Sequence, residues 1–103
     1  MSDDGFIART IRYEGNLMVN ICDEELLGKT VKDGALEMHI SADYFGGENV
    51  NSEEALELIR RSQIVNLAGT RIVERTLEAK LASPLAVKKI NSTFFLMIYK
   101  FNG

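Results

Sequence analysis

The 103 residues include 46% hydrophobic and 26% charged residues, the composition of one ordinary globular domain rather than of a disordered or fibrous chain. A single cysteine, Cys22, excludes an intramolecular disulfide, and with one histidine, His39, it is too few for the common zinc spacings. The net charge of −3 is uneven, since residues 1–50 carry −6 and residues 51–103 carry +3. An acidic chain is not an obvious polyanion binder, unless folding gathers the basic half on one side.

The first residues are acidic, where a secretory signal would be basic, and no apolar stretch follows them. The longest apolar run, residues 94–99, is far too short to span a bilayer. We therefore expect one domain over residues 1–103, with a disordered tail at 1–5, in the cytoplasm and without a membrane partner.

The first half of the chain predicts short strands. Residues 6–13 and 17–22 flank a glycine-containing tripeptide, which is typical of a β-hairpin. Residues 23–29 predict one helical turn, capped by Asp23 and stopped by Gly28. After a turn at 32–34, residues 35–40 predict a third strand, and residues 41–50 predict a loop.

Two helices and a closing hairpin are predicted in the second half. Asn51 and Glu54 match a capping box at the start of a helix that ends near residue 62. Thr70 is the predicted cap of a second helix, which has a clear 3.6-residue period and ends near residue 81. The segment 63–67 fits either a short buried strand or the start of that helix. Residues 86–90 and 93–101 predict the final hairpin.

The last strand is apolar and uncharged, so on an open sheet edge it would favour aggregation. It is best placed in the centre of the sheet. Strands first, helices next and strands last predict an α+β fold, with a mostly antiparallel sheet of about five strands and two main helices packed on one face.

Motifs for catalysis are absent. The sequence lacks a phosphate-binding loop, a dinucleotide-binding turn, a nucleophile elbow and a zinc-protease helix. Nucleophilic catalysis through a base would have to use His39, which the strand alternation predicts as an exposed residue. Cys22 fits a small buried hydrophobe better than a reactive thiol. We therefore assign no catalytic residue, metal ion or cofactor.

The first candidate binding segment is acidic. Asp23, Glu24 and Glu25 could hold a magnesium ion or a basic partner, because hard cations prefer clustered oxygens. The alternative is local helix capping, which uses the same residue types. Gly28 and Lys29 complete this segment, and Lys29 fits a solvated lysine as well as a contact residue.

The second candidate segment is the loop that contains Tyr44, Phe45, Gly46, Gly47 and Glu48. Paired glycines permit positive φ angles and let another backbone or a ligand come close. The adjacent aromatic rings could stack on a base or fill a pocket in a partner. Alternatively, one ring fills the core and the glycines only turn the chain.

The third candidate segment runs from Asn66 through Gly69 to a helix start. Free N–H groups at that start, with Arg71 and Arg75 one turn apart, would suit an anion or an RNA phosphate. The alternative is a tight strand-to-helix junction in which Arg71 and Glu74 pair on the surface.

Three segments, 22–29, 44–48 and 64–69, resemble the small archaeal family known as domain of unknown function number 424. The resemblance covers residues 10–100 and implies an archaeal cytoplasmic protein with no assigned activity, in the company of translation and ribosome-maturation proteins. The positions that match the family pattern are Asp23, Glu25, Leu27, Gly28, Gly46, Gly47, Glu48, Asn66 and Gly69.

Three functional hypotheses follow. The leading one is a non-catalytic binding module that contacts ribosomal RNA or a translation protein through the segment around Gly46 and Gly47 and the helix start at 69–75. The second is a small enzyme, metal-dependent or acting on a sugar-like substrate, that uses Asp23, Glu25 and Glu48. The third is a homodimer that pairs its final strand across a two-fold axis.

Overall fold

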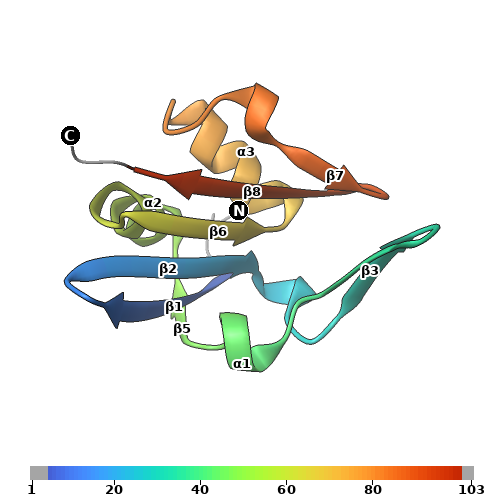
Figure 1. The fold of residues 1–103 in the computed structure, drawn as a ribbon, viewed down its shortest axis with the longest axis horizontal. Helices are drawn as coiled ribbons and strands as arrows, with labels where there is room; N and C mark the ends of the chain where they lie inside the picture. Colours follow the sequence, from blue (N-terminus) through green and yellow to red (C-terminus); the bar gives the residue numbers. More distant parts are fainter. Residues whose placement is uncertain (1–4, 101–103) are drawn as a thin grey trace.

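A six-stranded sheet forms the centre of the protein (Figure 1). The computed structural model describes residues 5–100. The strand order is β5-β1-β2-β6-β8-β7, and every neighbouring pair is antiparallel except β2 and β6, which are parallel. The strands are β1 (Phe6–Tyr13), β2 (Asn16–Asp23), β5 (Glu48–Val50), β6 (Ile64–Ala68), β7 (Lys88–Ile90) and β8 (Thr93–Tyr99).

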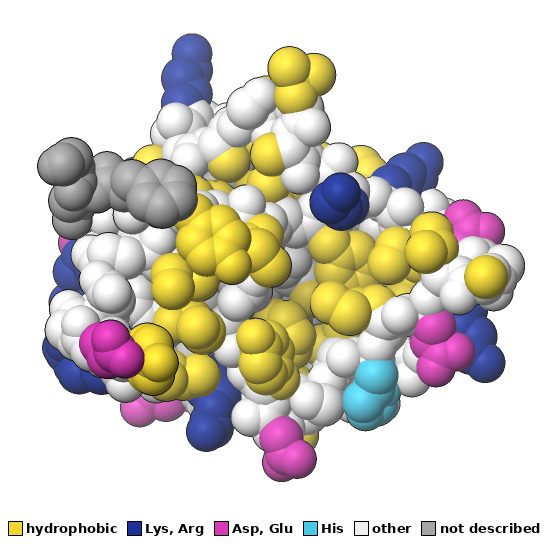
Figure 2. Space-filling view, viewed as in Figure 1, with side chains coloured by type: hydrophobic (Ala, Val, Ile, Leu, Met, Phe, Trp, Pro, Cys, Tyr) yellow, Lys and Arg dark blue, Asp and Glu magenta, His cyan; other side chains and the backbone are white. Residues whose placement is uncertain are grey.

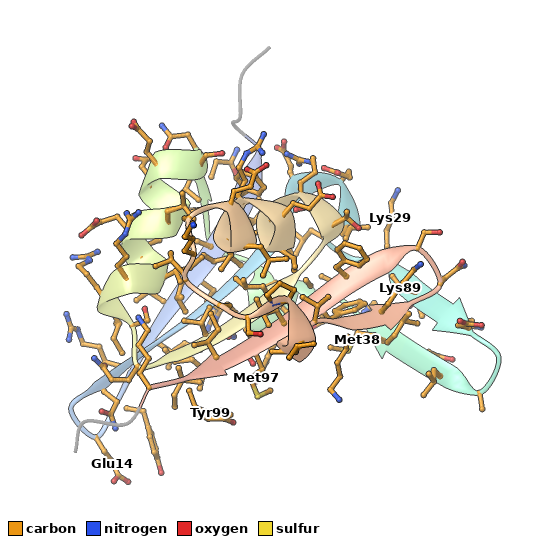
Figure 3. All side chains as sticks on the ribbon, turned by 90° about the horizontal axis from the view of Figure 1, so that it is seen from above. Glu14, Lys29, Met38, Lys89, Met97 and Tyr99 are labelled. Atoms are coloured by element: carbon orange, nitrogen blue, oxygen red, sulfur yellow. The ribbon has the colours of Figure 1, made fainter. Side chains whose placement is uncertain are left out.

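Two helices, α2 (Ser52–Arg61) and α3 (Thr70–Glu78), cover one face of the sheet (Figures 1 and 3). The predicted capping box of α2 is present, since Asn51 Oδ1 accepts from Glu54 N and Glu54 Oε1 accepts from Asn51 N. The main core lies between helices and sheet, and its buried members are Phe6, Ala8, Val19, Ile21, Ala55, Ile59, Val65, Leu67, Ile72, Val73 and Leu96.

The opposite face of the sheet is covered only at one end. There lie the short helix α1 (Ala42–Phe45) and a separate hairpin of β3 (Thr30–Asp33) and β4 (Leu36–His39), while the short helix η1 (Glu24–Leu26) continues directly from the end of β2 (Figure 1). A second, smaller core forms beneath them, with the buried residues Ile7, Cys22, Ile40, Phe45, Ala68 and Phe95. The remainder of this face, called here the open sheet face, is not covered by any element of residues 5–100.

The predicted α+β class, the mostly antiparallel sheet and both main helices are confirmed. The ambiguous segment 63–67 belongs to a strand, β6. The last strand lies inside the sheet, between β6 and β7, but it is second from the edge rather than in the centre, and β7 pairs with residues 93–95 of it. The final short helix, η2 (Pro84–Ala86), leads into β7.

Several details differ from the prediction. The sheet has six strands, because residues 48–50 of the predicted loop pair with the edge of β1. The predicted third strand instead pairs with β3 outside the main sheet, which leaves Leu36 and Met38 exposed. The second helix ends at Glu78 rather than near residue 81, since the chain takes a positive φ of 61° at Lys80.

The N-terminal tail was predicted to be disordered over residues 1–5. Residues 1–4 lie outside the described residues, but Gly5 is held in place. Its carbonyl oxygen accepts from Glu24 N and from Arg71 Nη2, both at 2.9 Å. Among residues 5–100, no helix has the length and apolarity needed to cross a membrane.

Candidate functional site

The end of β2 holds the start of α3. Asp23 Oδ2 accepts from the backbone N–H of Arg71 at 3.0 Å, and Asp23 Oδ1 accepts from that of Ile72 at 2.9 Å. Asp23 was predicted to cap its own turn and Thr70 to cap α3. Both predictions were wrong, because Asp23 makes no cap bond to η1 and the cap position of α3 is Gly69. The N–H groups at the start of α3, which the sequence predicted to be free for an anion, therefore already donate to a carboxylate at the end of β2.

Gly69 allows this close approach. Its φ of 131° is one that residues with a side chain rarely adopt, and a Cβ there would collide with the Asp23 carboxylate. Its N–H also donates to Phe94 O at 2.8 Å, which ties the junction to β8. Asp23 and Gly69 match the family pattern, and the structure gives both a folding role.

Arg71 is held by several groups at once. Its guanidinium donates to Glu25 through Nε at 3.1 Å and Nη2 at 2.7 Å, and it lies 4.8 Å from the ring centre of Phe6. The sequence offered Glu74, on α3 itself, as the surface partner of Arg71, and the structure has Glu25 in that role instead. Arg75, the second predicted anion ligand, pairs with Glu78 at 2.9 Å. Both arginines thus carry a carboxylate partner on the surface, which lowers the positive potential there.

Burial and charge shift the pKa values in this region. Burial raises the pKa of Asp23, against the opposing effect of the two N–H groups and Arg71. The hydrogen bonds from Arg71 lower the pKa of Glu25, and Glu25 in turn raises the pKa of Arg71. Burial, with Asp23 and Glu25 nearby, raises the pKa of Cys22 to about 12. Cys22 is therefore a protonated core thiol and not a nucleophile.

The three carboxylates of the enzyme hypothesis do not form one cluster. Asp23 and Glu25 both face the guanidinium of Arg71, at 3.9 Å and 2.7 Å, so a cation of the chain already occupies the space beside them. Glu48 stands on β5, which β1 separates from β2, so the two strands are about 10 Å apart. Within the described part of the chain, no group of three or more His, Cys, Asp or Glu side chains could hold a metal ion.

Gly46 and Gly47 are required for close packing rather than for positive φ angles. Neither has a positive φ. A Cβ on Gly47 would collide with the carbonyl oxygen of Ala8, and one on Gly46 with that of Ala42. The pair therefore lets the chain pass from α1 into β5 directly against β1.

The two adjacent aromatic residues have different environments. Phe45 is 3% exposed and fills the smaller core, whereas Tyr44 is 51% exposed, and their rings meet edge to face at 5.5 Å. Two side-chain amides fix α1 to the sheet. Asn20 Nδ2 donates to Tyr44 O at 3.0 Å, and Asn66 Nδ2 donates to Asn20 Oδ1 at 2.9 Å. Asn66 thus helps to fix Tyr44 at the edge of the open sheet face.

Gly28 and Lys29 join η1 to the end of the β3–β4 hairpin. Gly28 has a positive φ of 85°, and its N–H donates to Ile40 O at 2.6 Å. The N–H of Ile40 donates to Lys29 O at 2.9 Å. These backbone bonds anchor the hairpin, and the side chain of Lys29 is exposed.

An apolar groove of about 410 Å³ lies on the open sheet face between α1, β4, β8 and β7. Tyr44 and Met38 form one side, and Met97, 54% exposed, lies on the floor with Asn66. Lys88 is the one charged residue among those that line it. Figure 3 shows Met38, Met97 and Tyr99 on the side of the sheet opposite the helices.

The apolar surface continues beyond the groove along the sheet. The next row of side chains comes from four neighbouring strands: Tyr99, Ile64, Met18 and Ile11. Figure 2 shows hydrophobic side chains gathered in the middle of this face, with charged ones mostly around the rim. Large exposed apolar patches with a polar rim are typical of interaction sites.

Three residues of the groove, Tyr44, Phe45 and Asn66, are candidates from the sequence, whereas Met38, Met97 and Lys88 are not. The alternation of β8 held a usable signal, since Phe94, Leu96 and Ile98 face the main core while residues 95, 97 and 99 face the other way. The remaining candidates lie outside the groove. Glu48 lies at the sheet edge, and Arg75 lies on α3.

The fold and this surface define an α+β protein with one sheet face covered by helices and the other carrying an open apolar groove. The chain belongs to the family described as protein of unknown function (DUF424), whose model matches residues 11–101. The fold is similar to the crystal structure of an uncharacterized conserved protein from Methanopyrus kandleri, with a TM-score of 0.74 and 16% identity over 95% of each chain. None of the curated proteins matches the sequence.

Proposed function

We propose that the protein is a non-catalytic binding module that docks on a component of the translation machinery through its open sheet face. The observation that carries the proposal is the apolar groove, with Tyr44 on one side and Met97 on its floor, both about half exposed. Leaving this surface in water has a cost that burial against a partner would remove. The translation context comes from the family resemblance in the sequence.

Of the two partner classes, a translation protein fits this face better than ribosomal RNA. An RNA partner would use the tyrosines for stacking, but it also needs several cations for its phosphates. Among the described sheet residues on this face, the cations are Arg9 and Lys88, which stand on β1 and β7 with three strands between them. Arg9 already donates to Gly46 O at 3.3 Å. Apolar side chains of a protein match the remaining surface.

Co-sedimentation with archaeal ribosomal subunits across a salt series tests the proposal. Met97→Asp places a charge on the groove floor, and Leu85→Asp makes the same change at a side chain that is 96% exposed outside the groove. We expect wild type and Leu85→Asp to be retained and Met97→Asp to lose about tenfold in affinity, as for a central interface residue. Equal retention of both variants would contradict the assignment of the face.

The salt series separates the partner classes. Retention that persists at high salt indicates a protein contact, while a steep loss with rising salt indicates RNA phosphates. Sedimentation velocity of the protein alone, at several concentrations, tests the homodimer hypothesis. A strict monomer would exclude the pairing of two final strands across a two-fold axis.

A further inference from the structure

We infer that the groove takes an extended, apolar peptide segment of a partner protein that carries a carboxylate next to Lys88. This inference rests on the proposed function and names the chemistry of the partner. It follows from the charge of the groove, from its shape along β8 and from the groups that line it.

The charge of the groove is that of Lys88 alone. Lys88 pairs with Phe95, so its side chain projects on the open sheet face, whereas the adjacent Lys89 pairs with Phe94 and projects on the helix side. No ion pair of Lys88 is found within residues 5–100. A purely apolar occupant would cover this ammonium without replacing its water, which is unfavourable. A carboxylate, from an acidic side chain or a chain end, supplies the matching charge.

The shape of the surface fits an extended chain. The groove floor follows β8 from Phe95 to Met97, and Tyr99 continues the apolar surface beyond the groove. From Phe95 to Tyr99 the surface spans about 13 Å, at roughly 3.3 Å per residue. The side chains of an extended peptide on one side repeat every two residues, which is the same spacing. Alternate apolar side chains of such a segment would therefore meet successive rows of the open sheet face.

The lining supplies adaptable apolar contacts and one polar contact. Met38 and Met97 lie on different elements around the groove, and their flexible thioethers can adjust to side chains of different shape. Asn66 Nδ2 donates to Asn20, but the side-chain oxygen of Asn66, Oδ1, has no hydrogen-bond partner within the described residues. That oxygen can accept an N–H of a bound backbone, as in pockets where a few polar groups orient an apolar ligand.

Selection from a phage-displayed library of random dodecapeptides, with the full chain as bait, tests the inference. We expect enriched peptides with apolar residues at alternate positions and an Asp, a Glu or a free carboxyl end. A fluorescent copy of the best peptide then gives affinities by anisotropy for wild type, Lys88→Glu and the matched control Lys89→Glu. We expect about tenfold weaker binding to Lys88→Glu and less than a twofold change for Lys89→Glu.

A second peptide, with the carboxylate replaced by its amide, closes the cycle. It should bind wild type about tenfold more weakly and be insensitive to Lys88→Glu, because the same contact is already lost. Enriched peptides without a carboxylate, or equal binding to Lys88→Glu and Lys89→Glu, would overturn the inference. So would a selection that yields no peptide sensitive to Met97→Asp. In each case the proposed function still stands if ribosomal retention remains sensitive to Met97→Asp, and it fails with the inference if it does not.

Discussion

Replacing Asp23 by alanine should destabilise the protein severely, although Asp23 lies outside the groove. Asp23 is 3% exposed, and its carboxylate accepts hydrogen bonds from the backbone N–H groups of Arg71 and Ile72 in the first turn of α3. In the Asp23→Ala variant both donors lose their acceptor. The bond to Ile72 is buried, so water does not easily replace the carboxylate there.

The magnitude follows from these two bonds. Loss of a helix cap costs about 0.5–2 kcal/mol, and a buried donor left without an acceptor costs about 1–3 kcal/mol. Burial also desolvates the carboxylate, which raises the pKa of Asp23 and offsets part of the gain from these bonds. We therefore expect Asp23→Ala to lower the free energy of unfolding by about 3 kcal/mol, which for a chain of this size lowers the Tm by about 12–24 °C.

Urea unfolding, followed by circular dichroism at pH 7, measures this change. Asp33→Ala is the matched control, since Asp33 ends β3 at an exposed position. Asp23→Asn keeps one acceptor oxygen and should lose about half as much as Asp23→Ala. If Asp23→Ala lies within about 0.5 kcal/mol of Asp33→Ala, the long-range cap does not stabilise α3 and the reasoning is refuted.

Two substitutions and one labelling experiment test the same region. Glu25→Gln should lower the free energy of unfolding by about 0.5–1 kcal/mol at pH 7, as expected for an exposed bidentate pair. Because Arg71 lowers the pKa of Glu25, this difference is present above the ordinary pKa of 4.5 and is lost as the pH falls through the lowered value. Gly69→Ala should cost more than about 2 kcal/mol in urea unfolding, through its φ and the collision with Asp23. Cys22, with a pKa of about 12, should not react with dithiobis(nitrobenzoate) at pH 8 until urea unfolds the protein.

Each of these has a control or a contrary outcome. A Glu25→Gln difference that stays constant from pH 7 to pH 3 would exclude the ion pair as its cause. Gly34→Ala is the control for Gly69→Ala, because Gly34 also has a positive φ but open space around its Cα. Rapid labelling of the native thiol of Cys22 would mean that the smaller core opens readily.

The elements of the fold were readable from the sequence where a local pattern sets them. The capping box of Asn51 and Glu54 marks the start of α2 because both bonds form within one turn. The predicted turn of the first hairpin is present, but it has two residues, Glu14 and Gly15, rather than three, and both adopt the positive φ that such turns need. The loop at 41–50 was readable only in part, because pairing of β5 depends on β1, far away in the sequence.

Less of the candidate site could be predicted from the sequence, because it too depends on contacts between segments that are far apart in the chain. The aromatic pair and Asn66 stood out by composition, but the groove needs Met38 from β4, Lys88 from β7 and Met97 from β8 side by side. No local sequence pattern predicts that these three residues lie side by side, because their contact depends on how the β3–β4 hairpin packs against the sheet.

The sequence by itself determined the class of the fold, the two main helices and the inside position of the last strand, since periodicity and apolar runs act locally. Only the tertiary structure decided that Asp23 caps α3 through the N–H of Arg71, 48 residues further on, and that the side chain of Arg71 pairs with Glu25. It also decided which sheet face stays open. These outcomes depend on the parallel alignment of β2 with β6 and on which side of the sheet each connection crosses, and both are set by packing of the whole chain.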